Sequence, residues 1–253
     1  MILSTMRGMA SRPSTTRRRA PLRRLAGALV AGFALLGLVG CGGDAGDSGA
    51  GGEGPLVVAT TTQLADFVRT IGGDAVEVHG LIQPNVDAHD VDPSPADLDA
   101  LARADVIVAN GVGLEPWLDD AVAAAGATAA VTDTSTGVSV LGVGGDEGAD
   151  DRATTEADDH GDGANPHIWL DPRNARLMAT TVTEAIVAAL GDDATAAAAV
   201  QARGDAYDAE LVALDAEIDD LLADLPDRQL VTDHDAFAYF ADRYDLEVVG
   251  TVI

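Results

Sequence analysis

Three of the five histidines lie where predicted strands or helices end or begin, and their imidazoles could together bind a metal ion. His89 lies in a loop after a predicted strand, His167 comes just before a predicted helix, and His234 follows the apolar segment 229–232. A neutral imidazole nitrogen is a good zinc ligand, at about 2.0–2.1 Å from the ion. The separations of 78 and 67 residues are far longer than in a zinc finger. Only the tertiary fold can therefore bring the three rings together.

The other two histidines are predicted to have different roles. His79 lies in an alternating strand segment, which is typical of a structural or surface residue, and His160 lies in an acidic segment. Taken singly, a loop histidine is more often solvated or part of a helix cap than bound to a metal. The metal-site hypothesis therefore depends on the other three histidines together and on the sequence around them.

Predicted strands alternate with predicted helices along the chain. The strands are short apolar or alternating runs at 56–59, 76–82, 106–109, 229–232 and 246–249. Helical spacing is found at 62–71, 94–101, 114–125 and 172–190, in a long stretch up to 222, and in a short segment after His234. This alternation predicts an α/β fold with a mostly parallel sheet and helices on both faces. Loops at the carboxyl ends of such strands can converge in one crevice.

Helix starts and buried faces are predicted from capping residues and from spacing. N-caps are expected at Thr62, at Ser94 in a capping box with Asp97, and at Asp171. One apolar face of the 172–190 helix is expected to consist of Leu177, Met178, Val182, Ile186 and Leu190. The next helix repeats apolar residues at heptad-like intervals, namely Leu211, Leu214, Ile218, Leu221 and Leu222.

The charge of the chain excludes one large class of partner. The formal net charge is −27, from 42 acidic and 15 basic residues, and seven of the basic residues precede residue 25. A surface this negative repels phosphate backbones, so we expect no nucleic-acid binding. The single cysteine, Cys41, excludes an internal disulfide and every multi-cysteine metal or redox motif.

The first forty residues are predicted to be a lipoprotein signal peptide. A basic segment, 1–24, precedes an uncharged run of sixteen residues, 25–40, which is shorter than the roughly 20 residues of a membrane-spanning helix. The run ends in a sequence that resembles a lipobox, in which Cys41 would be lipidated and become the first mature residue. The alternative is a signal anchor that happens to end near a cysteine. The glycine-rich segment 41–55 is predicted to be a flexible tether between the lipid anchor and the folded part.

An acidic segment interrupts the folded part of the sequence. Residues 144–164 contain eight acidic side chains and one histidine but no large apolar residue. Such a composition cannot bury enough surface to fold, and it predicts a disordered loop. The simplest interpretation is a solvated insertion, and the alternative is a weak cation-capturing segment.

Four motifs in the chain resemble one family, the metal-binding lipoproteins that serve ATP-binding-cassette importers for zinc and manganese. The similarity runs from about Pro55 to the last residue. It is carried by Asp87-Ala88-His89 with Pro93-Ser94-Pro95-Ala96-Asp97, by the run from Asn110 to Leu118, by the run from Asn165 to Pro172, and by the run from Thr232 to Phe240.

This resemblance implies a fold and a set of ligands. It implies two Rossmann-like α/β lobes, 56–171 and an incomplete 191–253, joined by a long rigid helix at 172–190. One metal ion would lie between the lobes. The implied ligands are His89, where Ala88 replaces the usual proline, then His167, and then His234, at a position that is commonly histidine in zinc carriers and glutamate in manganese carriers. A fourth ligand, an aspartate or a water, would come from farther along the second lobe, so no fourth residue is assigned.

Both the resemblance and the ligand chemistry favour zinc over manganese. Imidazole suits Zn²⁺, whereas Mn²⁺ prefers hard oxygen ligands, although Cu²⁺ and Ni²⁺ also bind nitrogen sites strongly. The carboxylates of Asp87, Asp90 or Asp235 are candidates to orient the imidazole rings. Because imidazole must be deprotonated to bind, metal affinity should fall below about pH 6.5.

The expected function is capture of a divalent metal at the outer face of the cell membrane. The chain would be a monomeric, lipid-anchored solute-binding protein that delivers Zn²⁺ to a membrane permease and performs no catalysis. One alternative is a zinc-dependent hydrolase, because three histidines and a water also form catalytic zinc sites. The sequence contains no HExxH motif to support that alternative. A cell-surface adhesin is a further alternative, for which the sequence gives no evidence either way.

Overall fold

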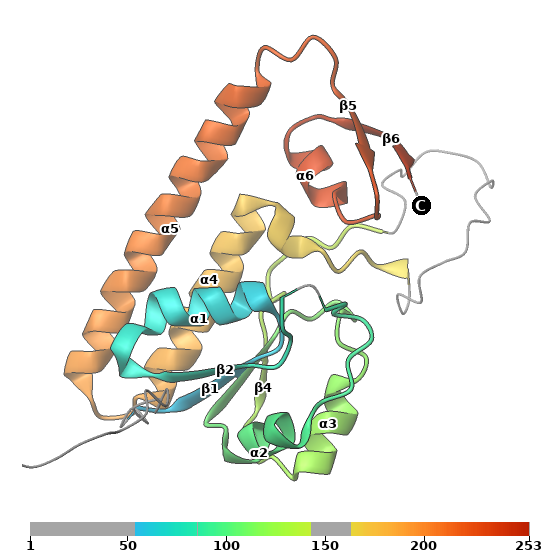
Figure 1. Ribbon diagram of the computed structural model, residues 1–253. Helices are drawn as coiled ribbons and strands as arrows, with labels where there is room; N and C mark the ends of the chain where they lie inside the picture. The colour runs from blue at the N-terminus through green and yellow to red at the C-terminus, as the bar shows by residue number, and fades with distance from the viewer. Residues whose placement is uncertain (1–53, 85, 143–162, 253) are drawn as a thin grey trace, which may run out of the picture. The chain divides into compact units, whose positions relative to one another are not determined.

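The computed structural model describes residues 54–84, 86–142 and 163–252, and its first part is built on a parallel sheet of four strands (Figure 1). In spatial order the strands are β2 (Glu77–Gly80), β1 (Leu56–Ala59), β3 (Val106–Ala109) and β4 (Val131–Asp133). The predicted α/β fold with a parallel sheet is therefore confirmed. The signal peptide, Cys41, most of the tether, His160 and nearly all of the acidic segment lie outside the described residues.

The two central strands are buried on both faces. Val57 pairs with Val78 of β2 and Val106 of β3, and every residue of β1 and β3 is buried. Such strands have continuous apolar sequences, which is why they were predictable. The edge strand β4 was missed, because its partly exposed Val-Thr-Asp sequence has no apolar run.

Helices cover both faces of this sheet and form two separate parts of the core. On one face, Val57 and Val108 pack with residues of α1 (Thr62–Gly72) and α4 (Pro172–Ala189). On the other, Val58 and Ile107 pack with residues of α2 (Pro95–Arg103) and α3 (Leu118–Ala125). Alternate strand residues thus serve opposite faces, as the two-residue period of a strand requires.

Two of the three predicted N-caps are present, the third lies one residue earlier, and a further helix begins later than predicted. The capping box of α2 and the Asp171 cap of α4 are both present. The cap of α1 is Thr61, one residue before the expected Thr62, and its hydroxyl accepts a hydrogen bond from the Leu64 amide. The third helix begins at Leu118 and not at 114, because Pro116 disfavours a helical conformation at Glu115, and the chain before Leu118 forms turns.

The two long helices, α4 and α5 (Ala194–Leu222), pack against each other. They approach closely at Gly204, where a Cβ would lie 2.6 Å from the Thr183 hydroxyl oxygen. The predicted face of α4 is buried at Met178, Val182 and Ile186, but Leu177 is exposed. The prediction of a long helix up to residue 222 is confirmed, but its apolar residues at heptad-like intervals are not buried beyond Leu211, and Leu214 and Leu221 are exposed.

A second, smaller sheet forms the C-terminal region. Its parallel strands are β5 (Gln229–Thr232) and β6 (Glu247–Thr251), with α6 (Ala238–Arg243) between them in sequence (Figure 1). Strand β5 has the predicted bounds but is not the buried strand expected, since only Thr232 is buried. A bidentate ion pair from Arg243 to Asp215 ties this region to α5. Two short 3-10 turns are also present: Gly73–Ala75 follows α1, and Ile168–Leu170 precedes α4.

None of the helices in the described ranges combines the length and the apolar character needed to span a bilayer.

Candidate metal centre

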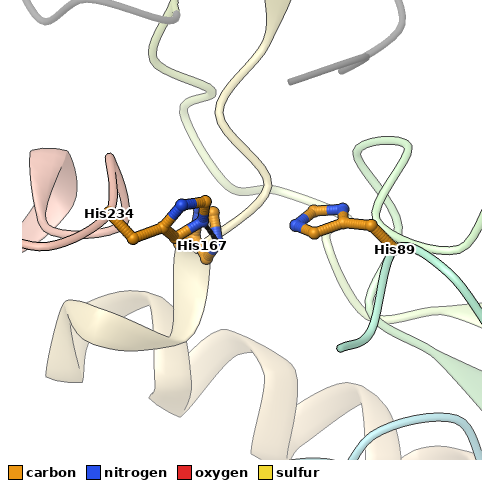
Figure 2. Close-up of side chains that lie close together, drawn as sticks. All are labelled: His89, His167 and His234. Atoms are coloured by element: carbon orange, nitrogen blue, oxygen red, sulfur yellow. Dashed lines mark hydrogen bonds between the residues drawn. The ribbon is translucent and has the colours of Figure 1, made fainter. Parts of the chain in front are cut away.

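The three histidines singled out in the sequence lie together in the structure, although they come from three different segments (Figure 2). His89 follows β2, His167 precedes the 3-10 turn before α4, and His234 follows β5. One ring nitrogen from each can be chosen so that all three lie within 4.8 Å of one another. Nε2 of His234 is 3.1 Å from Nε2 of His167, and the His89 ring points toward the other two. This spacing suits three ligands around a single ion.

His167 is the most deeply held of the three. Its side chain is buried, and both its backbone N–H and its ring Nδ1 lie within hydrogen-bond distance of Oδ1 of Asn165, at 3.0 and 2.9 Å. The preceding carbonyl, that of Pro166, accepts a hydrogen bond from the Asn110 side chain at the end of β3. The Trp169 ring packs beside the imidazole, with 5.3 Å between the ring centroids. These contacts fix the ring of His167 before any metal arrives.

His89 is held by its loop and not by burial. The Asp87 carboxylate accepts a hydrogen bond from the His89 backbone N–H at 2.9 Å, and Nε1 of Trp117 donates to the Ala88 carbonyl at 2.9 Å. Asp87 and His89 thus repeat the relation between Asn165 and His167. In both cases an oxygen of an Asp or Asn side chain accepts the backbone N–H two residues on, as in an Asx-turn.

A half-buried carboxylate, that of Glu115, organises the segment that reaches the His89 loop. Glu115 accepts hydrogen bonds from the Thr60 hydroxyl and from the backbone N–H groups of Asn110 and Gly111. Burial raises the pKa of Glu115, and these hydrogen bonds oppose that rise. The carboxylate therefore holds the turn over 111–113 and places Trp117 next to Ala88.

His234 is half-buried, like His89, and its loop is tied to the His167 segment. Nδ2 of Asn165 donates to the backbone carbonyl of Asp235 at 2.9 Å. The Tyr239 hydroxyl donates to the Asn165 carbonyl at 2.7 Å and accepts from the Leu141 amide at 3.0 Å. Asn165 thus contacts the segments of two of the three histidines.

The three imidazoles lie on the wall of a pocket of about 610 Å³. Its other walls include both polar and apolar side chains, among them Thr61, Gln63, Ile82, Asp87, Leu114 and Trp169. A hydrated divalent ion is small compared with this volume. The pocket therefore gives an ion access from solvent to the three nitrogens.

The histidines were more predictable from the sequence than the groups that orient them. Of the three proposed carboxylates, Asp87 bonds the backbone of His89, and Asp235 contributes its backbone carbonyl. Asn165 was not predicted as a partner of His167, although its place two residues before that histidine was the available signal. His79 has the structural role expected, because its Nε2 lies 2.7 Å from an Asp97 carboxylate oxygen.

A family model described as zinc-uptake complex component A, periplasmic, matches residues 57–253 of the chain. Among curated proteins, the iron-binding protein YfeA of Yersinia pestis is 29% identical over 195 residues, which are 76% of this chain and 58% of that protein. The manganese-binding lipoprotein MntA of Halalkalibacterium halodurans is 28% identical over 202 residues, or 78% of this chain and 60% of that protein.

Solved structures show the same similarity. A zinc-bound crystal structure of a ZnuA deletion mutant aligns with a TM-score of 0.67 and 30% sequence identity, covering 78% of this chain and 70% of that one. The chain spans about three-fifths of the length of the curated relatives it matches.

Proposed function

This chain belongs to the family of periplasmic zinc-uptake components, and on that premise we propose that it captures a divalent metal ion at His89, His167 and His234 for delivery to an ATP-binding-cassette importer. The observation that carries the proposal is the set of three ring nitrogens within 4.8 Å, contributed by segments far apart in the sequence. Three such nitrogens meeting on the wall of an open pocket suit the reversible capture of an ion.

Zinc is the metal we propose as the principal cargo. Relatives carry names for iron and manganese binding, and a zinc-bound structure is among the solved neighbours, so the family accommodates several ions. In this chain the three converging side chains are all imidazoles. Imidazole suits Zn²⁺, and an all-nitrogen set is unfavourable for Mn²⁺, which prefers oxygen.

Isothermal titration of the metal-free chain with Zn²⁺ and, separately, with Mn²⁺ tests this proposal. We expect one zinc ion per chain and a zinc affinity well above the manganese affinity. Tighter manganese binding would overturn the choice of cargo, and the absence of saturable binding of either ion would overturn the site. Turnover of an ester substrate with added zinc would favour the hydrolase alternative, which we do not adopt because the family is one of transport components.

For the membrane anchor and the order of the domains, the proposal keeps the expectations from the sequence. We propose that lipidated Cys41 anchors a monomer at the outer face of the membrane, with 41–55 as the tether. Lobes at 56–171 and 191–253 would be joined by the helix at 172–190. Globomycin, which blocks lipoprotein signal cleavage, should then cause the precursor to accumulate in a native host, and replacement of Cys41 by Ser should release the protein from the membrane.

A further inference from the structure

Asn165 contacts the segments of two of the three histidines, those of His167 and His234. Its side chain is buried, and the residue is 1% exposed. Oδ1 lies 3.0 Å from the His167 backbone nitrogen and 2.9 Å from the ring Nδ1 of the same residue, while Nδ2 lies 2.9 Å from the Asp235 carbonyl oxygen. One amide group therefore contacts both the His167 ring and the loop that carries His234.

The backbone partners settle which end of this amide donates. A backbone N–H only donates and a backbone carbonyl only accepts, so the atom facing the His167 N–H is the oxygen and the atom facing Asp235 is the NH₂ group. Ring Nδ1 of His167 faces that same oxygen, which makes Nδ1 the protonated nitrogen. In the neutral ring the lone pair is then on Nε2.

This tautomer presents the metal-binding atom to the centre of the cluster. Nε2 of His167 is the atom that lies 3.1 Å from Nε2 of His234. Since His167 accepts at this position, the proton in the contact is on Nε2 of His234. For that Nε2 to bind an ion, the proton moves through solvent to Nδ1 of the same ring, which stays neutral. The Asn165 amide thus decides which nitrogen of the buried ring can bind.

We propose that Asn165 is the positioning residue of the centre: it sets the tautomer of His167 and, through Asp235, holds the His234 loop within reach of the same ion. This inference rests on the proposed metal-binding function. It adds a residue that acts through two ligands without touching the metal. Partners of this kind tune affinity by about 10- to 100-fold in metal sites.

Two substitutions separate the contact made by the amide oxygen from the contact made by the amide NH₂ group. Asn165→Ala removes both contacts. Asn165→Asp keeps an oxygen acceptor for the His167 ring but loses the donor to the Asp235 carbonyl. We expect Asn165→Ala to weaken zinc binding of the full chain by about 10- to 100-fold. The Asp variant should recover part of that loss. Equal zinc affinity in all three proteins would overturn the proposal.

The tautomer itself gives a readout that a merely structural role would not change. In metal-free, ¹⁵N-histidine-labelled chain at about pH 8, long-range ¹H–¹⁵N spectra should show His167 protonated at Nδ1 in the parent and in Asn165→Asp. Asn165→Ala should convert it to the Nε2–H form or to a mixture. An unchanged His167 pattern in the Ala variant would overturn the proposal.

Tyr244→Phe provides the matched control for loss of stability. It removes the 3.0 Å hydrogen bond from a buried tyrosine hydroxyl to Asp215 of α5 and leaves Asn165 intact. We expect this variant to unfold at a lower temperature while its zinc affinity and His167 tautomer stay those of the parent. If Tyr244→Phe lowered affinity as much as Asn165→Ala, the effect would be one of stability and the proposal would fall. If the parent bound no zinc, the proposed function would fail, while the spectra would still test the tautomer.

Discussion

The two sheets of this protein are built from similar apolar sequences but differ in how they are covered. In the four-stranded sheet, Val57 and Val58 are fully buried, whereas in the two-stranded sheet Val231 is 57% exposed. Helices lie on both faces of the first sheet, while the second packs mainly with α6. The proposed metal centre takes His167 from beside the first region and His234 from the second. The two proposed ligands therefore differ in how firmly the protein holds them.

The largest effect should come from removing these ligands, and it should differ between the two regions. We expect His234→Ala to lower zinc affinity by more than the roughly 10- to 100-fold typical of an outer-shell partner, with the fold intact. His167→Ala should cause a similar loss of affinity and also a lower unfolding temperature, because this ring is buried and hydrogen-bonded. Calorimetric titration and thermal unfolding measure the two effects.

His79→Ala is the control for these substitutions. It removes an imidazole that pairs with Asp97 and lies outside the three-histidine cluster, so zinc affinity should not change. A variant of His234 with the affinity of the parent would remove that residue from the site.

Matched valine substitutions test the difference in packing directly. Val58→Ala deletes two methyl groups from a closed core and should lower the free energy of unfolding by about 2–3 kcal/mol. Val231→Ala, in an exposed strand, should change it by less than about 0.5 kcal/mol. Urea unfolding of both variants gives the comparison. Equal losses would show that β5 is as well packed as β1.

The ion pair that joins the second region to α5 should depend on pH. Hydrogen bonding from Arg243 lowers the pKa of Asp215 in the folded protein, opposed by burial. Such a group contributes stability above its unfolded pKa of about 3.9, and the contribution is lost as pH falls through the lower folded value. Asp215→Asn should therefore cost about 1–2 kcal/mol at pH 7 and progressively less below about pH 4.

Asp208→Asn is the control for that measurement. Asp208 also pairs with an arginine, Arg176, but both side chains are about 40% exposed, and such pairs contribute little. We expect a change of less than about 0.5 kcal/mol at pH 7. A pH-independent loss in Asp215→Asn would show that the carboxylate charge is not what stabilises the contact.

The smallest effect should come from the acidic segment. Deleting 144–164 should leave zinc affinity within about two-fold of the parent, because the three nitrogens lie elsewhere in the chain. A large loss in the same titration would mean that the segment supplies ligands.

Sequence patterns predicted the first sheet better than the second for a physical reason. A continuous apolar run predicts a strand whether or not helices pack against that strand in the fold. The bounds of β5 were therefore predicted correctly, whereas its burial was not. The start of α3 was placed four residues too early, because the apolar spacing continues back to Leu114 although Pro116 disfavours a helical conformation at the residue before it. Whether the apolar residues of α5 beyond Leu211 are buried depends on where the neighbouring helix α4 ends. The local spacing of apolar residues carries no information about that.

The candidate site shows the same limit at the level of single hydrogen bonds. Residue type and motif selected His89, His167 and His234, since few side chains can ligate zinc. The choice of Asn165 over a carboxylate as ring partner of His167 required coordinates, because both side chains offer an oxygen acceptor.

The chain contains two tryptophans, and both adjoin the metal centre: Trp169 packs on the His167 ring and Trp117 bonds the backbone beside His89. Zn²⁺ has a filled d shell and no colour of its own. The ultraviolet fluorescence of the protein comes mainly from these two indoles, one beside His167 and one beside the His89 loop. Their emission can therefore report metal binding without an added probe. Replacing one indole at a time would assign the fluorescence change on metal loading to one side of the centre or the other.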